Sequence, residues 1–200
     1  NEVSTWRSED KLLFFAEGVV RRTWNNTNKS WKHEINPYSN LSYYFITEGD
    51  NPLQMNEDEA SGSSTIITEV SHNVVYEEDS HAWYEGGRQF YDAYNFATGN
   101  AKTYTLDTPE ATKASASLDL SFSASSTSAT EVMVTCGDTQ IGRFSIRNCR
   151  DHEKAIDRKQ HYTINSLGNT TPLKFTTTQG RDARLNYLSL TYKRQLTANG

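Results

Sequence analysis

The chain has 200 residues, of which 35% are hydrophobic and 12% aromatic, and its formal net charge is −5. This aromatic content is too high for a disordered tail, and the longest apolar run, Leu12–Ala16, is far shorter than the roughly 20 residues that span a bilayer. A weakly acidic chain without basic runs also lacks the positive patch that phosphate binding needs. We therefore expect a single domain over residues 1–200 that neither spans a membrane nor binds nucleic acid.

Alternation of apolar and polar residues, together with β-branched and aromatic composition, predicts a succession of short β-strands. In chain order the predicted strands are Lys11–Ala16, Ser42–Thr47, Thr65–Ser71, Thr103–Leu106, Ala114–Ala124, Glu131–Cys136, Ile141–Ile146, Gln160–Ile164, Leu173–Thr178 and Arg184–Gln195. Strands at this spacing, without a long amphipathic helix, predict an all-β fold, an antiparallel and jelly-roll-like β-sandwich. One or two short helices are expected, at His81–Glu85 and between Asp151 and Lys159.

The clearest alternation is in Ala114–Ala124, where even-numbered positions are Ala, Leu or Phe and odd-numbered positions are Ser or Asp. It predicts one dry face toward the core and one wet face. The β-rich runs 131–136 and 141–146 flank a turn at Gly137–Asp138 and predict a hairpin. Near Tyr187 the apolar phase changes from odd to even positions, which predicts a β-bulge.

No sequence motif assigns catalytic residues. The GxSxG elbow is absent, and the five histidines (His33, His72, His81, His152 and His161) lie outside any catalytic phrase. The acidic clusters Asn56–Glu59 and Glu77–Asp79 lack the ordered ligand spacing of a calcium loop, and Cys and His residues are not at zinc-ligand spacing. We therefore expect no catalytic residue, no metal site and no cofactor in this chain.

The N-terminal residue is Asn1 rather than Met, and no signal-like apolar stretch follows it. We therefore expect a processed product or a fragment of a larger protein, from which any targeting segment has been removed. In an exported protein, Cys136 and Cys149 would form a disulfide, and otherwise they would be two unpaired thiols. The residues leave both alternatives open.

An aromatic cluster offers the best candidates for binding. It consists of Trp83, Tyr84, Phe90, Tyr91, Tyr94 and Phe96. Alternation predicts that Phe90, Tyr94 and Phe96 point into the core, where aromatic side chains dominate the packing energy. Trp83, Tyr84 and Tyr91 remain available for stacking on a sugar or anchoring a protein partner, and with Arg88 they are the candidate binding residues.

Four phrases in this order resemble one known family. The first is Asp10–Gly18 (DKLLFFAEG), and the second is His33–Thr47 (HEINPYSNLSYYFIT). The third joins Tyr76–Asp79 (YEED) to Gly87–Tyr91 (GRQFY), and the fourth is Leu185–Leu196 (LNYLSLTYKRQL). Together they resemble the β-rich region that precedes the catalytic domain in the type IX secretion sortase (PorU) family, the gingipain-like C25 cysteine peptidases of Bacteroidetes.

The resemblance implies a non-catalytic module in front of a C25-type cysteine peptidase or sortase domain, in an exported protein at the bacterial cell surface or outer membrane. That protein would process secreted cargo or attach it to the outer-membrane glycolipid, with an outer-membrane β-barrel as partner. The family's catalytic His and Cys lie in a downstream α/β domain, and nothing in this chain matches their motif. Neither Cys136 nor Cys149 therefore inherits the role of nucleophile.

Two other functions stay open on the residues alone. Exposed aromatic side chains are also typical of a carbohydrate-binding or adhesin-like sandwich. The third alternative is a free-standing hydrolase with its site in β loops, which a thiol-directed or serine-directed probe would label.

Overall fold

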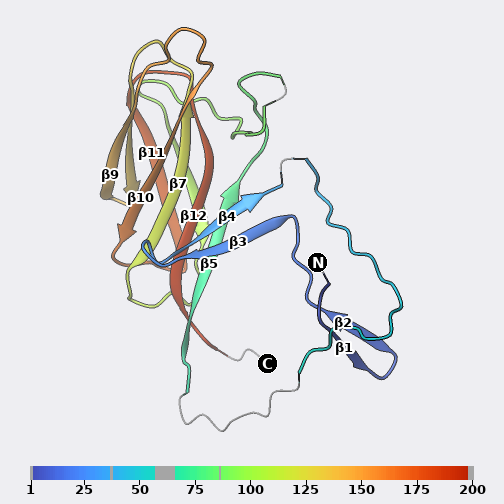
Figure 1. Ribbon diagram of the computed structural model, residues 1–200. Helices are drawn as coiled ribbons and strands as arrows, with labels where there is room; N and C mark the ends of the chain where they lie inside the picture. The colour runs from blue at the N-terminus through green and yellow to red at the C-terminus, as the bar shows by residue number, and fades with distance from the viewer. Residues whose placement is uncertain (1, 37, 57–65, 86, 198–200) are drawn as a thin grey trace. The chain divides into compact units, whose positions relative to one another are not determined.

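The computed structural model describes residues 2–36, 38–56, 66–85 and 87–197 (Figure 1). These residues form strands β1 to β12 and contain no helix, so none of them forms a helix able to cross a membrane. The chain divides into two compact units. Unit 1 comprises Asn1–Arg22 and His33–Ile66, and unit 2 comprises Thr23–Lys32 and Ile67–Gly200.

Unit 1 is built on a short antiparallel hairpin of β1 (Thr5–Ser8) and β2 (Lys11–Phe14). The segment around Gln54 pairs with the start of β1, where the Thr5 N–H donates to the Leu53 carbonyl at 2.9 Å. A second hairpin consists of β3 (Val20–Asn25) and β4 (Ser30–Ile35), and its tip, Thr23–Lys32, belongs to unit 2.

Unit 2 contains two four-stranded sheets, with strand orders β10-β7-β12-β5 and β6-β11-β8-β9. The strands are β5 (Glu69–Glu77), β6 (Ala101–Asp107), β7 (Ala116–Ala124), β8 (Thr130–Cys136), β9 (Thr139–Ile146), β10 (Ile156–Ile164), β11 (Thr170–Gln179) and β12 (Ala183–Gln195). All neighbouring strands are antiparallel, and every connection except the β8–β9 hairpin crosses to the other sheet. This is the connectivity of a jelly roll. The predicted antiparallel β-sandwich is confirmed, and its two sheets are confined to residues 69–195.

The hydrophobic core lies between the two sheets and is centred on aromatic rings. Phe122 of β7 is fully buried, and its ring centroid lies 5.3 Å from that of Phe96, 5.5 Å from Phe144 and 5.2 Å from Phe175. The even-numbered residues of β7 all face this core, as their alternation predicts. The β8–β9 hairpin and the bulge between Leu185 and Tyr187 are also confirmed.

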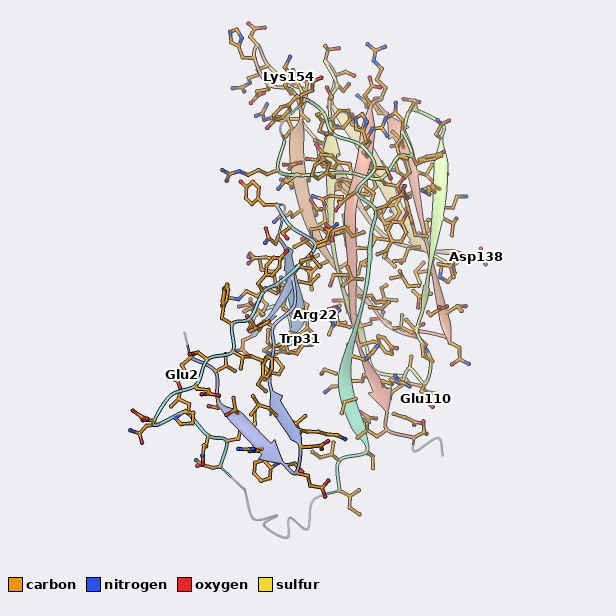
Figure 2. The ribbon with its side chains drawn as sticks, turned by 90° about the vertical axis from the view of Figure 1, so that its right-hand side faces the viewer. Glu2, Arg22, Trp31, Glu110, Asp138 and Lys154 are labelled. Atoms are coloured by element: carbon orange, nitrogen blue, oxygen red, sulfur yellow. The ribbon has the colours of Figure 1, made fainter. Side chains whose placement is uncertain are left out.

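The outer face of the sheet β10-β7-β12-β5 is covered over part of β7 and β12, which corrects the prediction of a wet face along all of β7, whereas the outward residues of β10 are exposed. Ser121 and Ser123, on the face predicted to be wet, are 1% and 0% exposed. The tip of the β3–β4 hairpin lies on β12, where the Trp31 N–H donates to Thr191 Oγ1 and Ser189 Oγ donates to the Trp31 carbonyl, both at 3.2 Å (Figure 2). Polar side chains on this face therefore hydrogen-bond the backbone N–H and carbonyl groups of the hairpin tip, in place of water.

Three predicted elements are wrong. Residues 42–47 form no strand, residues 81–85 form a bend and turn, and residues 156–159 begin β10 instead of ending a helix. Both expected helices fail for one reason: their backbones pair with residues distant in the sequence, as His81 does with Tyr91 and Ile156 with Ala124. Local capping residues carry no information about such partners.

The two cysteines lie near opposite ends of the β8–β9 hairpin. Cys136 ends β8 and pairs with Thr139, whereas Cys149 follows the other end, where Thr130 pairs with Ile146. At about 3.3 Å per residue the two ends are roughly 20 Å apart, far beyond the 4.4–6.8 Å between the Cα atoms of a disulfide. Both thiols are free, so the disulfide that the sequence left open is not formed.

The acidic clusters do not converge on a metal site in the part of the chain that the structure describes, where no three His, Cys, Asp or Glu side chains are placed to hold an ion. Glu78 instead accepts hydrogen bonds from Ser80 Oγ at 2.6 Å and from the Tyr76 hydroxyl at 2.9 Å. Glu57–Glu59 of the first cluster and Thr65, the predicted start of a strand, lie outside the described residues.

Candidate functional site

A pocket of about 570 Å³ lies at the end of the sandwich where β10 begins, the end at which Figure 2 labels Lys154. Its lining comes from the loop before Asp92 and from the start of β10 with the residues that precede it. The lining residues are Trp83, Tyr84, Gly87, Arg88, Gln89, Tyr91, His152, Lys154, Ala155 and Asp157. All four residues selected from the sequence for binding, Trp83, Tyr84, Arg88 and Tyr91, thus line one pocket.

Backbone pairing closes the loop that carries these four residues. The His81 N–H donates to the Tyr91 carbonyl and the Tyr91 N–H donates to the His81 carbonyl, each at 2.8 Å. One residue further on, the Asp92 N–H donates to the Leu185 carbonyl at 2.8 Å, which ties the loop to β12. The loop is therefore fixed at its base to the edge of β12, beyond the residues that pair with β5.

A buried ion pair strengthens this anchor. Asp92 is fully buried, and its carboxylate accepts two hydrogen bonds from Lys102 Nζ, at 2.9 and 3.0 Å, and one from the Tyr76 hydroxyl at 2.9 Å. Burial alone would raise the pKa of Asp92, but hydrogen bonds from the Tyr94 N–H, Lys102 and Tyr76 outweigh it and hold the pKa below its usual range. Asp92 is therefore ionised, and both of its carboxylate oxygens accept hydrogen bonds.

Tyr91 is the buried aromatic residue of the pocket lining, and it contacts the exposed Asp157. Tyr91 is 4% exposed, and its hydroxyl donates to Asp157 Oδ1 at 2.9 Å. Burial, together with the nearby charge of Asp157, raises the pKa of Tyr91, so its hydroxyl stays protonated at neutral pH. This contact joins the loop to β10. Tyr91 therefore supports the structure of the loop and offers little exposed surface to a ligand.

Trp83 forms the wall toward the sheet. Its Nε1 donates to Ser123 Oγ at 3.0 Å, and its ring meets the His81 ring edge-on at 5.0 Å between centroids. The guanidinium carbon of Arg184 lies 5.6 Å from the Trp83 ring, within cation–π range. Burial and the positive charge of Arg184 lower the pKa of His81, so this histidine is neutral at pH 7.

The rim of the pocket is accessible and carries two cationic side chains, Arg88 and Lys154. The Tyr84 ring is 56% exposed, and Arg88, His152 and Lys154 are also exposed. Asp157 is the acidic residue of the lining, and it already accepts the Tyr91 hydroxyl. An exposed ring beside hydrogen-bond donors can stack on and orient a ligand, which is the chemistry of a binding site.

The prediction that Phe90, Tyr94 and Phe96 all point inward is right for Phe96 and wrong for Phe90. Phe96 is fully buried, Tyr94 is half-buried against the core, and Phe90 is 36% exposed. The chain bends between Tyr91 and Phe96 instead of running as one strand, so the period-two phase is lost. Tyr91 consequently takes the buried place expected for Phe90.

His152, Lys154 and Asp157 also line this pocket but are not among the residues predicted from the sequence. They lie in the segment read as a second short helix, and only the pairing of β10 with β7, which sets Asp157 opposite Ser123, brings them to the loop. Asp157 is the second residue of β10, and nothing in the neighbouring sequence indicates that it belongs to a binding site.

The approach to β10 is held by an ion pair. Arg147 donates from Nη1 and Nη2 to the two carboxylate oxygens of Glu153, at 2.7 and 2.6 Å. The Arg150 N–H adds a third hydrogen bond at 2.8 Å. These hydrogen bonds lower the pKa of Glu153 from 4.5 to about 2.

This depressed pKa gives a pH-dependent prediction. Because the folded-state pKa lies below the ordinary value, the contribution of Glu153 to stability is present above about pH 4.5 and is lost as the pH falls toward 2. We expect the Glu153 carboxyl carbon to titrate near pH 2 by NMR, and near its ordinary value in the Arg147→Met variant. A wild-type midpoint near 4.5 would contradict the bidentate contact.

The described residues show no activated nucleophile. His161 Nδ1 lies 2.8 Å from Asp119 Oδ1 across β10 and β7, but no hydroxyl or thiol in this part of the chain hydrogen-bonds His161. Burial raises the pKa of the Cys136 thiol, the opposite of what a reactive cysteine needs.

Fold and pocket together define the class: an eight-stranded jelly-roll module with a pocket at one end of its sandwich. No family model and no curated protein matches the sequence. Among solved structures, the dimeric latent PorU of Porphyromonas gingivalis matches 100% of this chain with a TM-score of 0.73 and 18% sequence identity. The resemblance expected from the four phrases is confirmed at the level of the fold, and the chain spans 20% of the length of that PorU chain.

Carbohydrate-binding modules are more distant matches. A family 35 module from an environmental isolate has a TM-score of 0.42 and 17% identity, covering 68% of this chain and 96% of the module. A family 35 module from Cellvibrio japonicus has a TM-score of 0.43 and 10% identity, covering 64% of this chain and 100% of the module.

Proposed function

We propose that residues 1–200 are a non-catalytic module of a larger exported protein at the bacterial cell surface, preceding a C25-type cysteine peptidase or sortase domain. The observation that carries the proposal is the fold likeness to PorU, because it extends over the whole chain and includes both compact units. The four ordered sequence phrases support the same assignment. In this proposal the partners are the downstream domain, secreted cargo and an outer-membrane β-barrel protein.

The module would contribute a docking pocket to that protein. Trp83 and Tyr91 hold the pocket in shape through Ser123 and Asp157, and Tyr84 and Arg88 stand at its rim. A partly exposed aromatic ring over an anchored loop is the kind of residue that carries a large share of binding energy at protein interfaces. We propose that the pocket receives a segment of secreted cargo.

The Tyr84→Ala variant tests this role without disturbing the fold, since the ring is 56% exposed. In the full-length protein we expect about tenfold or greater loss of affinity for a cargo-derived peptide in calorimetry, as for a truncated hot spot. Phe15→Ala, which removes a ring that is 70% exposed in unit 1, is the matched control and should bind normally. Equal affinity of Tyr84→Ala and wild type would contradict the role.

The same exposed ring favours a second candidate, saccharide binding, since sugars stack on accessible aromatic faces. A glycan-binding screen with and without chelator distinguishes the two. Glycan binding that Tyr84→Ala abolishes, with no effect on cargo affinity, would favour the carbohydrate-binding or adhesin-like function. Peptide cleavage by purified residues 1–200 would overturn the non-catalytic assignment itself.

A further inference from the structure

Residues 41–47 of unit 1, Leu-Ser-Tyr-Tyr-Phe-Ile-Thr, have the composition of a β-strand but belong to no sheet (Figure 1). Aromatic and β-branched residues of this kind are enriched in strands. Their side chains are instead open to solvent: Phe45 is 95% exposed, Ile46 77% and Tyr43 73%. We call residues 41–47 the apolar segment.

Most of the backbone of the apolar segment has no hydrogen-bond partner among the described residues. Within the described residues, the N–H and carbonyl groups of Ser42–Ile46 make no hydrogen bond, although Leu41 bonds to the Ser39 hydroxyl. Extended backbone with free N–H and carbonyl groups is a template for pairing with another strand. The composition and the unpaired backbone groups thus both indicate pairing with another β-strand.

Tyr44 holds the apolar segment in place. Its hydroxyl donates to the Glu17 carbonyl, and its ring packs on Phe14 of β2 with centroids 5.6 Å apart. Tyr44 is 40% exposed, whereas its neighbours Tyr43 and Phe45 are 73% and 95% exposed. The segment is therefore tethered to unit 1 through one residue and presents its neighbours outward, which lowers the entropy cost of forming a strand.

We propose that residues 41–47 form a β-strand by adding to the edge of a sheet in another domain of the same polypeptide. Only an extended strand offers backbone donors and acceptors at the matching spacing, and the outward Tyr43 and Phe45 require an apolar surface beside that edge. This inference rests on the proposed function, in which the chain belongs to a larger protein.

Two observations favour a domain of the same polypeptide as the occupant. The fold likeness to PorU spans only 20% of that chain, so a protein of that kind contains much additional polypeptide. An uncovered strand of aromatic residues is also an aggregation hazard, which a permanently attached partner removes. Covalent linkage raises the effective concentration of such a partner to the millimolar range for short flexible linkers.

Hydrogen–deuterium exchange on the natural full-length protein tests the proposal. We expect the amides of residues 43–46 to exchange about 100-fold more slowly than in an unstructured chain. Phe45→Asp should remove roughly tenfold or more of this protection. Leu196→Asp, at a residue 54% exposed in unit 2, is the control and should leave it unchanged.

A photoreactive phenylalanine analogue in place of Tyr43 identifies the occupant. A cross-link to residues beyond position 200, with the mass of one chain on a denaturing gel, supports the proposal. Freely exchanging amides, or a cross-link to a second copy or to a different protein, would overturn it. A natural polypeptide that ends near Gly200 would instead contradict the proposed function, so the two failures are distinguishable.

Discussion

Replacing Phe122 by alanine is expected to lower the free energy of unfolding by roughly 3–5 kcal/mol, the range for truncating a buried aromatic residue. Phe122 is fully buried and stands at the centre of three other rings, from Phe96, Phe144 and Phe175. These rings come from the loop before β6, from β9 and from β11, so no single backbone shift brings all three into the cavity. Urea unfolding, followed by tryptophan fluorescence, measures the loss.

The control for this prediction is Phe15→Ala, because the Phe15 ring is 70% exposed. Its free energy of unfolding should change by less than about 0.5 kcal/mol, as for most surface substitutions. A loss below about 1 kcal/mol in Phe122→Ala would contradict a core centred on this ring.

The second large effect is expected at Asp92, where Asp92→Asn should cost about 3 kcal/mol. Removing one partner of a buried ion pair leaves the other charge uncompensated, and such losses are of order 3–5 kcal/mol. The Lys102 side chain retains 29% exposure, which places the expected value at the low end. The amide would also turn a donor toward Lys102, which is itself a donor.

A double-mutant cycle isolates this interaction. Asp92→Asn combined with Lys102→Met should be more stable than the sum of the single losses implies, because it removes the unpaired charge. Asp138→Asn changes the net charge equally at an exposed turn and should be near neutral. Additive losses, or an Asp92→Asn variant as stable as wild type, would show that the pair does not anchor the loop.

The core of the fold was predictable because it depends on local alternation. Leu118, Leu120 and Phe122 are buried as their even positions indicate, and the hairpin turn at Gly137 is where the sequence places it. What covers the opposite face of β7 was not predictable. Ser123 accepts a hydrogen bond from Trp83, a residue 40 positions away. The sequence alone does not distinguish a serine that is buried against an indole from one that faces water.

The candidate site was predictable only in part. Trp83, Tyr84, Arg88 and Tyr91 lie close together in the sequence, so their clustering is visible there, and the structure places them around one pocket. Asp157 could not be found in this way, because it meets Tyr91 only through the register of β10 on β7.

The apolar segment shows the reverse case, in which the local sequence is typical of a strand and the described residues of this chain supply no partner strand. Tyr43, Phe45 and Ile46 satisfy every local criterion for β-structure, but strand formation requires a second strand. The wrong prediction at this position is the observation that motivates the proposed contact with another domain.

The most direct test of the proposed function is the sequence of the gene beyond the codon for Gly200, checked against the intact mass of the natural protein. We expect the reading frame to continue into an α/β domain that carries the His and Cys of C25 peptidases. A stop codon shortly after Gly200 would contradict the assignment and leave a free-standing β-sandwich, for which saccharide binding becomes the leading function.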